Sequence, residues 1–556
     1  MQYHHSRCRL TFWLAALFFT VLGAKLRAVQ LFGSPLPLWD QWYEAENFLR
    51  PWQEGGLTWT GLFSPSNEHR IFFTHLLDVC LIRLNGRWEP LLQMTVNAFI
   101  HAGFACGLAV YLWISFGRLH AGLICALLAP FYALPYAGEN TIWPINSQLY
   151  FLSLCALAAI AGLGFGIPGG RAWWLGAVAA VLGLFTMASG LLAPLAVAGL
   201  VFLRALKNRR LEKSHLLTLA VCGVAILLGF TMNISMPADQ PLRAHSVHQF
   251  AAALVQNLAW PFSEHPAMTC LMLLPLAGLL VLYFRRDFAL ARAAEFLLVL
   301  ALWSALQSAA LAFGRANYGG GFPASRYMDM LNILAIASLA AVVLLQPLWP
   351  RGGFLRHLGW LLPLLFASAI LLQLAKISQL VTDGLLLPTR TMNLVAEERV
   401  ETFLTTGDQR ELFEAPTVRP DPRVTLGVLQ NPKLQPILPL ACQPPSARPA
   451  IGRLAAGANW LLRHANFILS TGLLLFAGIS GWLLWRSADD GVFGKPVLLI
   501  VLLLAVGALG WVWSSHPPTR REYERSLQSQ LADYFRIIHN DKRAAIHAHK
   551  AEALKN

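Results

Sequence analysis

The chain has 556 residues, of which 56% are hydrophobic and 13% are charged, whereas an average soluble domain is about 25% charged. With a mean hydropathy of +0.51, this composition excludes a soluble globular enzyme, a disordered chain and a collagen-like chain. We interpret the formal net charge of +14 as basic loops facing anionic lipid, because Lys and Arg orient membrane helices. Eight cysteines in so long a chain predict no disulfide framework.

Apolar runs of about 20 residues, the length that crosses a bilayer, recur along the chain. They predict an all-α polytopic membrane protein with about thirteen transmembrane helices. The first is expected to be a retained signal anchor, with a signal peptide cleaved near Ala24 as the alternative. The run 71–84 is interrupted by polar residues and predicts an amphipathic helix at the membrane surface. The predicted spans are 10–31, 91–116, 119–136, 149–167, 172–188, 190–206, 215–235, 266–284, 293–313, 329–349, 358–376, 460–485 and 496–513.

Basic residues predict the orientation of these spans. They precede the first span and gather between alternate spans, most densely at 204–213, so the positive-inside rule places the N-terminus in the cytoplasm. Thirteen spans place the basic C-terminal tail outside, against this rule, so either the tail is an outer helix or one span is miscounted. The predicted units are a transmembrane catalytic module at 1–376 with outer loops 34–90, 137–148, 236–265 and 314–328, a Pro-rich periplasmic domain at 377–459, two spans within 460–513, and a basic amphipathic tail at 514–556.

The first outer loop places an acidic residue just beyond the first span. A helix beginning at Asp40 would put Asp40, Glu44 and Asn47 on one face. A carboxylate at the membrane surface is partly desolvated, which raises its pKa toward the range of a general base. We therefore predict that Asp40 is a general base. The alternative is an aromatic belt with a solvated acidic face, because tryptophans in this loop favour the headgroup region.

Three adjacent polar residues, Glu68, His69 and Arg70, precede the amphipathic run. Arg70 and His69 are predicted to bind a phosphate, because a guanidinium forks onto phosphate oxygens. The alternative is a helix N-terminus capped by Asn67.

The loop 137–148 carries many hydrogen-bonding groups for its length. An indole face stacks on a sugar ring while amides bind its hydroxyls, so this loop predicts a sugar or acceptor site. The alternative is an ordinary polar turn. With Glu68 added from the first loop, the predicted sugar- or acceptor-binding residues are Glu68, Glu139, Asn140, Trp143, Asn146 and Gln148.

A later loop carries Arg315 and Arg326 on the outer side, against the charge rule, and cations in such positions often have a function. Three consecutive glycines allow the backbone to approach a ligand closely. We predict that Arg315, Arg326 and Tyr327 bind a phosphate, with structural pairing to Asp329 or Glu68 as the alternative. Histidines scattered over 236–265 show no metal-ligand spacing, and no nucleic-acid motif is present.

With Trp39-Asp40-Gln41 directly after the first span, the architecture resembles the GT-C class of polytopic glycosyltransferases. The resemblance implies an inverting transfer of a sugar from a polyprenyl-phosphate donor to a glycan, lipid or protein acceptor, on the outer face of a bacterial inner membrane. It implies that Asp40 is the general base and that basic residues stabilise the departing lipid phosphate. Many members carry paired acids in this loop. Gln41 follows Asp40 here, so the second acid would be Glu44 or a distant residue, and no divalent metal is indicated.

Two other functions compete with this one. A transporter or flippase of a lipid-linked or anionic solute would need charged residues deep within the spans. Between 91 and 206 the spans offer His101 and Arg118 at most, which favours surface chemistry. The third hypothesis is a non-catalytic envelope-assembly protein. Gln307, within a predicted span, is expected to make a hydrogen bond between helices.

Overall fold

The computed structural model describes residues 2–116, 121–232, 234, 237–285, 290–317, 323–345, 353–413, 421–486, 507, 510, 520–537 and 541–554. Within these ranges the chain is helical, and nine helical segments are long and apolar enough to cross a membrane, or ten if the bent pair α21–α22 counts as one span. The chain is therefore a multi-pass membrane protein. The spans are built from α1 (Gln2–Phe32), α6 (Pro90–Phe116), α7 (Ala121–Ala133), α9 (Ser147–Phe165), α11 (Leu192–Asn208), α12 (Lys213–Thr231), α15 (Ala291–Gly314), α16 (Met328–Leu345), α17 (Gly353–Val381), α21 (Arg453–Arg463) and α22 (Ala465–Arg486).

The prediction of about thirteen spans is confirmed only in part. Two predicted spans, 172–188 and 266–284, correspond to α10 (Arg171–Gly183) and α14 (Met268–Tyr283), which are shorter than a full span. Helix α10 ends because the chain turns at Gly183 into η4 (Ala188–Leu191). Hydropathy counts apolar residues but does not register such a turn. Most of the predicted span 496–513 lies outside the described residues.

Helices α1 and α22 pack closely because small residues line their contact. A Cβ on Gly23 would lie 2.3 Å from the backbone N of Leu469, and a Cβ on Gly472 would lie 2.3 Å from the backbone N of Thr20. Transmembrane helices use such residues to bring their backbones together, since lipid tails offer no hydrophobic drive for association. This contact packs the first span, α1, against α22 near the other end of the chain.

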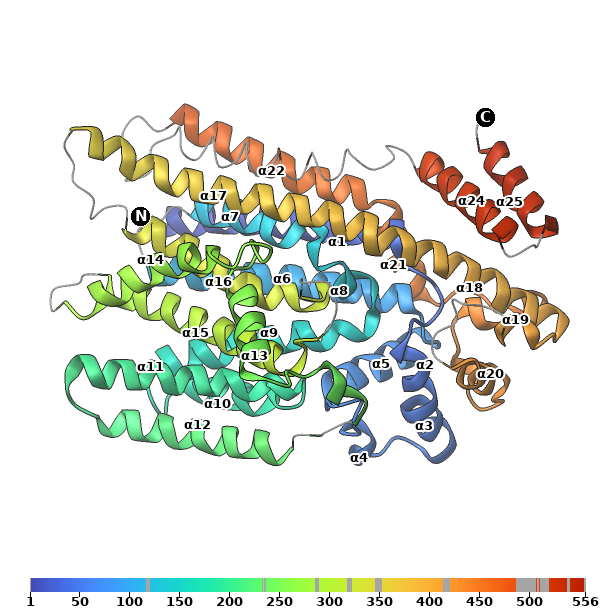
Figure 1. The fold of residues 1–556 in the computed structure, drawn as a ribbon, viewed down its shortest axis with the longest axis horizontal. Coiled ribbons are helices and arrows are strands. Elements are labelled where there is room, and N and C mark those ends of the chain that lie inside the picture. Colours follow the sequence, from blue (N-terminus) through green and yellow to red (C-terminus); the bar gives the residue numbers. More distant parts are fainter. Residues whose placement is uncertain are drawn as a thin grey trace.

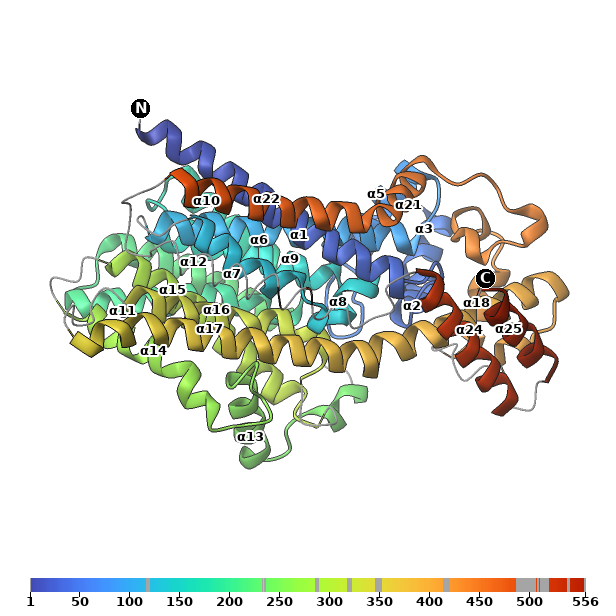
Figure 2. The ribbon, with the colours of Figure 1, turned by 90° about the horizontal axis from the view of Figure 1, so that it is seen from above.

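The short helices of the first loop and those of the Pro-rich segment lie at the same end of the bundle, which we call the loop end (Figures 1 and 2). The N-terminus and the α11–α12 connection lie at the opposite end. The loop-end helices are α2 (Asp40–Glu44), η1 (Ala45–Leu49), α3 (Arg50–Gly55), α4 (Trp59–Leu62), α5 (Phe72–Asn85), α18 (Leu387–Thr406), α19 (Arg410–Phe413) and α20 (Pro422–Gln430).

One apolar cluster joins the first loop to the Pro-rich segment, so the two form a common core outside the spans. Its members include Trp42, Phe48, Trp88, Val400, Phe403, Leu429 and Leu438. The predicted boundary at 376/377 falls inside a continuous helix, because α17 passes through the π-helical turn η8 (Thr382–Leu386) into α18. The predicted helix over 71–84 is present as α5.

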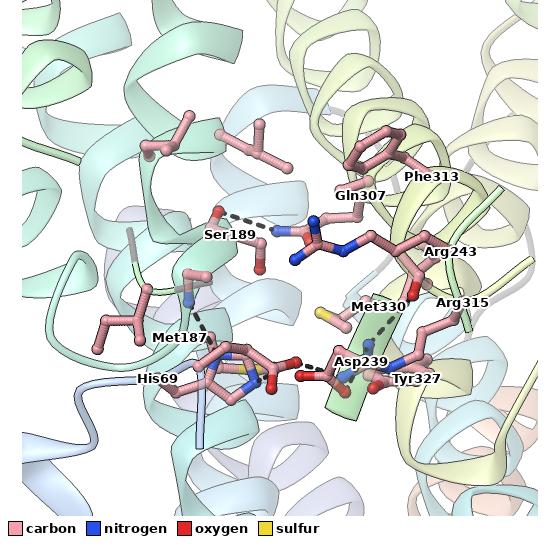
Figure 3. A pocket seen from close by; sticks show the side chains of 18 of the residues that line it. His69, Met187, Ser189, Asp239, Arg243, Gln307, Phe313, Arg315, Tyr327 and Met330 are labelled. Carbon is pink, nitrogen blue, oxygen red and sulfur yellow. Dashed lines mark hydrogen bonds and ion pairs between the residues drawn. The ribbon is translucent and has the colours of Figure 1, made fainter. Parts of the chain in front are cut away.

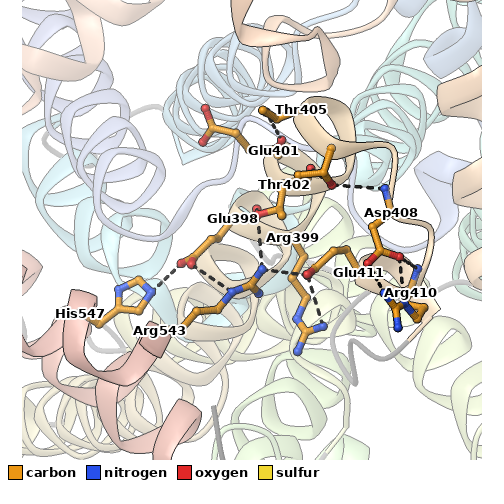
Figure 4. A network of polar contacts seen from close by, with 11 residues as sticks. Glu398, Arg399, Glu401, Thr402, Thr405, Asp408, Arg410, Glu411, Arg543 and His547 are labelled. Atoms are coloured by element: carbon orange, nitrogen blue, oxygen red, sulfur yellow. Dashed lines mark hydrogen bonds and ion pairs between the residues drawn. The ribbon is translucent and has the colours of Figure 1, made fainter. Parts of the chain in front are cut away.

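The C-terminal helices α24 (Arg520–Ile537) and α25 (Asp541–Ala553) dock on α18 at the loop end (Figures 1 and 4). Nη2 of Arg543 lies 2.9 Å from Oε2 of Glu411, and Nε2 of His547 lies 2.5 Å from Oε2 of Glu398. Phe535 stacks on His547 and packs beside Val395. The described part of the tail therefore shares the loop end with the first loop.

Glu89 links the start of α6 to the Pro-rich segment. Its Oε1 accepts a hydrogen bond from the backbone N of Leu440 at 3.0 Å, and the neighbouring Trp88 N donates to Ile437 O at 2.8 Å. Burial raises the pKa of Glu89 to about 7, although the bond from Leu440 N opposes this shift.

We predict that Glu89→Gln stabilises the protein at alkaline pH. Because the folded state holds the Glu89 proton up to a pH of about 7 and the unfolded chain loses it near 4.3, stability falls as pH rises across this window. Glutamine keeps the acceptor oxygen and removes the charge. Thermal unfolding of the detergent-solubilised protein should give equal midpoints at pH 4 and a higher midpoint for Glu89→Gln at pH 8.

The control is Glu54→Gln, an exposed carboxylate of the same loop whose pKa is lowered by its hydrogen bond to Arg50. Its titration lies below the window, so this variant should keep the wild-type pH slope. A wild-type slope in Glu89→Gln would contradict the assignment.

Candidate functional site

The backbone before Asp40 is strained. Trp39 has a φ of 47°, a region that costs a non-glycine residue about 1–3 kcal/mol. Two contacts maintain it: the backbone N of Leu38 donates to Oε1 of Gln41 at 3.0 Å, and the indole of Trp39 stacks on Trp143 at 5.6 Å between centroids. Strain that is maintained in this way is typical of functional sites. The strained conformation of Trp39 fixes the position of Asp40, which is the first residue of α2.

Asp40 is half-buried near three charged groups from other parts of the site. Burial raises the pKa of its carboxyl, the Arg326 guanidinium opposes that shift, and the carboxylates of Glu44 and Glu68 add to it. The structure thus brings Asp40 within electrostatic reach of Arg326, which lies 286 positions later in the sequence. A carboxyl whose pKa is raised is suited to accept a proton near neutral pH.

Glu44 is paired with His75. Its Oε2 lies 2.7 Å from Nε2 of His75, whose ring stacks on Phe48 at 4.0 Å. Asn47 is exposed, so the expected shared face of Asp40, Glu44 and Asn47 is wrong. The reason is the π-helical turn η1, which changes the helical register after Glu44. Sequence reasoning did not single out His75, because its partner lies 31 residues away.

Glu139 and Arg326 form the central ion pair of the site. Glu139 Oε1 lies 3.2 Å from Nη1 of Arg326, and its Oε2 accepts hydrogen bonds from the Arg326 backbone N at 2.8 Å and from Ser325 Oγ at 3.0 Å. Only 4% of Glu139 is exposed. The pair joins α8 (Gly138–Ile142) to η6 (Ser325–Tyr327), so a residue predicted to bind sugar instead positions one predicted to bind phosphate.

Two other members of the predicted sugar set hold this loop together. Nδ2 of Asn140 donates to the Arg326 carbonyl at 2.9 Å, and Nδ2 of Asn146 donates to the Glu139 carbonyl at 3.2 Å. By contrast, Trp143 Nε1 and Gln148 Oε1 are buried and make no hydrogen bond within the described part of the chain. Trp143 and Gln148, together with Oδ1 of Asn140, are therefore the members of the set that keep a polar atom for a ligand.

Arg315 lies between two carboxylates. It makes an ion pair with Glu68, and its Nη1 lies 3.2 Å from Oδ1 of Asp239. For Arg315 the structure therefore shows the alternative interpretation, a structural ion pair with Glu68. Burial and the hydrogen bond to Glu68 raise the pKa of Asp239, and the Arg315 charge opposes this shift. Asp239 stood out only as one of several scattered polar residues in the sequence.

His69 and Arg70 differ in their surroundings. Nδ1 of His69 accepts a hydrogen bond from the Ala188 backbone N at 3.3 Å. Burial, assisted by the Arg315 charge, lowers the pKa of His69 to about 4, so its ring is neutral at neutral pH. Arg70 donates from Nη1 to the Phe63 carbonyl at 3.0 Å and closes its own turn. The described contacts connect Arg70 with neither Asp40 nor Arg326.

A cavity of about 420 Å³ lies beside these groups (Figure 3). Figure 3 shows Arg243 reaching into it toward Gln307. Nε2 of Gln307 donates to the Ser189 carbonyl at 3.5 Å, which confirms the expected bond between elements. Tyr327 also lines the cavity. The guanidinium carbon of Arg326 lies over the Tyr327 ring, 5.0 Å from the ring centroid. The ionisable lining residues are Glu68, His69, Asp239, Arg243 and Arg315, and the apolar ones include Leu191, Leu192, Phe230, Leu311 and Phe313.

The fold and site define a multi-pass helical membrane protein with a charged, partly apolar cavity at the loop end. Comparison of the chain with protein-family models, with curated proteins and with solved structures found no match. Among the residues that the structure describes, no group of three or more His, Cys, Asp or Glu side chains could hold a metal ion.

We predict that Glu139 and Arg326 are energetically coupled. Glu139→Gln and Arg326→Met should each destabilise the protein, because each removes one charge of an ion pair whose carboxylate is buried. The double variant should recover about 1–3 kcal/mol relative to the sum of the two. Chemical unfolding of the four proteins in detergent measures this coupling.

The exposed pair Asp408–Arg410 is the control for this cycle, since ion pairs in water contribute little. Its variants Asp408→Asn and Arg410→Met should show no measurable coupling. Strict additivity for Glu139 and Arg326 would show that the two side chains act independently.

Proposed function

We propose that this chain is a GT-C-like membrane glycosyltransferase. It would transfer a sugar, with inversion, from a polyprenyl-phosphate donor to a glycan, lipid or protein acceptor on the outer face of a bacterial inner membrane. One observation carries the proposal: Asp40, with a raised pKa, lies at the loop end within electrostatic reach of Arg326 and of Glu68, and Glu68 lines a cavity with charged and apolar residues.

The chemistry assigns a role to each group. Asp40 removes the proton of the acceptor hydroxyl, whose oxygen attacks the anomeric carbon of the donor sugar. The bond between that carbon and the lipid phosphate breaks, and negative charge grows on the leaving phosphate. Arg326 is placed to stabilise this charge because Glu139 and Tyr327 hold it from two sides. Arg243 and Arg315 add further positive charge along the cavity.

The apolar lining supports a lipid-linked donor. Leu191, Leu192 and Phe230 line the cavity, and 64% of Phe230 is exposed. In a membrane such a surface faces hydrocarbon. A prenyl chain can therefore lie along this surface while its phosphate reaches the arginines. Nucleotide sugars do not occur outside the cytoplasmic membrane, so an outward-facing site needs a lipid-carried donor.

A second candidate function is a transporter or flippase of the same lipid-linked or anionic solute. The observation in its favour is that Lys25, His101 and Asp329 are buried within the spans, where ionisable groups often serve transport. The scarcity of charges in the spans of 91–206 argues against transport, but Lys25 and Asp329 lie in spans outside that range. The two functions differ in their product: a new glycosidic bond, or an unchanged solute on the other side.

We predict that Asp40→Asn lowers glycosyl transfer by at least about 100-fold, because the amide cannot accept the acceptor's proton. The measurement uses proteoliposomes supplied with a polyprenyl-phosphate sugar and envelope extract, with the glycosylated product quantified by mass spectrometry. Glu46→Gln is the matched control, since Glu46 lies in the same segment and pairs with Arg50. It should transfer at the wild-type rate.

Near-normal transfer by a folded Asp40→Asn protein would remove Asp40 as the base. Movement of the labelled donor across the bilayer, with no new glycosidic bond in any variant, would favour the transporter.

A further inference from the structure

A second polar cluster lies inside the bundle, apart from the cavity. Lys25 in α1, His101 in α6 and Asp329 in α16 are 2%, 1% and 8% exposed, and all three lie within spans. Lys25 is seven residues before the end of α1, which is about 10 Å along the helix. His101 is near the middle of α6. Three ionisable groups therefore meet below the membrane surface, on helices distant in sequence.

Hydrogen bonds and close approaches join these groups. Nζ of Lys25 donates to Oγ1 of Thr141 at 3.3 Å. Oδ2 of Asp329 accepts a hydrogen bond from Nδ2 of Asn140 at 2.8 Å and lies 4.0 Å from Nε2 of His101. The ammonium of Lys25 and the carboxylate of Asp329 also interact electrostatically. The cluster thus combines an acid, a base and an imidazole.

Aromatic rings enclose the cluster. His101 stacks on Tyr150 at 4.5 Å between centroids and meets Tyr132 edge-on at 5.3 Å. Tyr136 accepts a hydrogen bond from Nδ2 of Asn332 at 2.7 Å. The groups that face Asp329 are therefore one cation, one imidazole, three phenols and two amides, contributed by seven different elements.

Many polar atoms in this cluster have no hydrogen-bond partner among the described residues. The buried atoms without a partner are Oδ1 of Asp329, Nδ1 of His101, the hydroxyl of Tyr132, and Oδ1 of Asn140 and of Asn332. In a bilayer each such group costs several kcal/mol, so five in one place indicate a polar occupant. A water molecule supplies two to four hydrogen bonds and satisfies both donors and acceptors. A metal cation is disfavoured, because the Lys25 ammonium already supplies positive charge here.

We propose that Asp329, with Lys25 and His101, forms a hydrated proton-binding site inside the bundle. A proton passes from an internal water, as hydronium, to Oδ1 of Asp329. The hydronium O–H bond breaks as the carboxyl O–H bond forms, and a neutral water remains. A structural ion pair in hydrocarbon would satisfy both carboxylate oxygens, whereas only Oδ2 of Asp329 has protein partners.

Asn140 connects this proton to the candidate functional site. Its Nδ2 donates both to Oδ2 of Asp329 and to the carbonyl of Arg326. A bond to a carboxylate is about twice as strong as one to a neutral acid. Protonation of Asp329 therefore weakens one of the two bonds that hold Asn140 against Arg326. This inference does not depend on the glycosyl-transfer reaction.

Infrared difference spectroscopy of the full-length protein in nanodiscs, titrated with pH, tests the proposal. The wild type should show the carbonyl band of a buried protonated carboxyl that grows as pH falls. The band should be absent in Asp329→Asn and present in the exposed control Asp383→Asn. In Lys25→Met the band should persist to higher pH, because the cation that stabilises the carboxylate is gone.

Exchange into D₂O tests the hydration in the wild type, so this arm needs no variant to fold. A hydrated carboxyl exchanges its proton rapidly and its band shifts at once. The proposal is overturned if the band survives in folded Asp329→Asn or if it does not shift in D₂O. It is also overturned if no carboxyl band titrates in the wild type.

Discussion

The structure at the loop end depends on one constraint: a charged group buried among membrane helices must find its partner inside the protein. Glu139 meets this constraint by binding the guanidinium, the backbone N and the serine neighbour of Arg326. The pair ties the short helix α8 to the start of α16, and Asn140 adds a bond to the Arg326 carbonyl. The position of Arg326 relative to Asp40 follows from these contacts.

A second consequence concerns the parts outside the spans. The first loop and the Pro-rich segment bury apolar side chains against each other in one common cluster. Glu89 joins the same two parts through Leu440, and the C-terminal helices cover α18 from another side. Asp40, the acidic residue after the first span, therefore lies on a part of the protein that several elements hold in place. A general base needs to be held in position in this way.

The proposed transferase and the proposed proton site use different groups but share Asn140. Asp40, Arg326 and the cavity lie at the loop end, whereas Lys25 lies about two helical turns before the end of α1 and Asp329 lies in the first turn of α16. When both proposals are taken together, protonation of Asp329 alters the hydrogen bonding of Asn140, which also binds the Arg326 carbonyl. Energetic coupling between two sites is carried by packed side chains and hydrogen-bond networks that have two discrete arrangements.

Hydropathy and short spacing act within a few residues, so local patterns in the sequence determined several features. These are the helical membrane character, the amphipathic helix α5, the acid just after the first span and the interhelical bond of Gln307. The lengths of α10 and α14, the register change at η1 and the pairs Glu44–His75, Arg315–Asp239 and Lys25–Asp329 came only from the tertiary structure. Glu139 and Arg326 show the reason: their attraction depends on a distance in space, and a separation of 187 positions in the sequence carries no record of it.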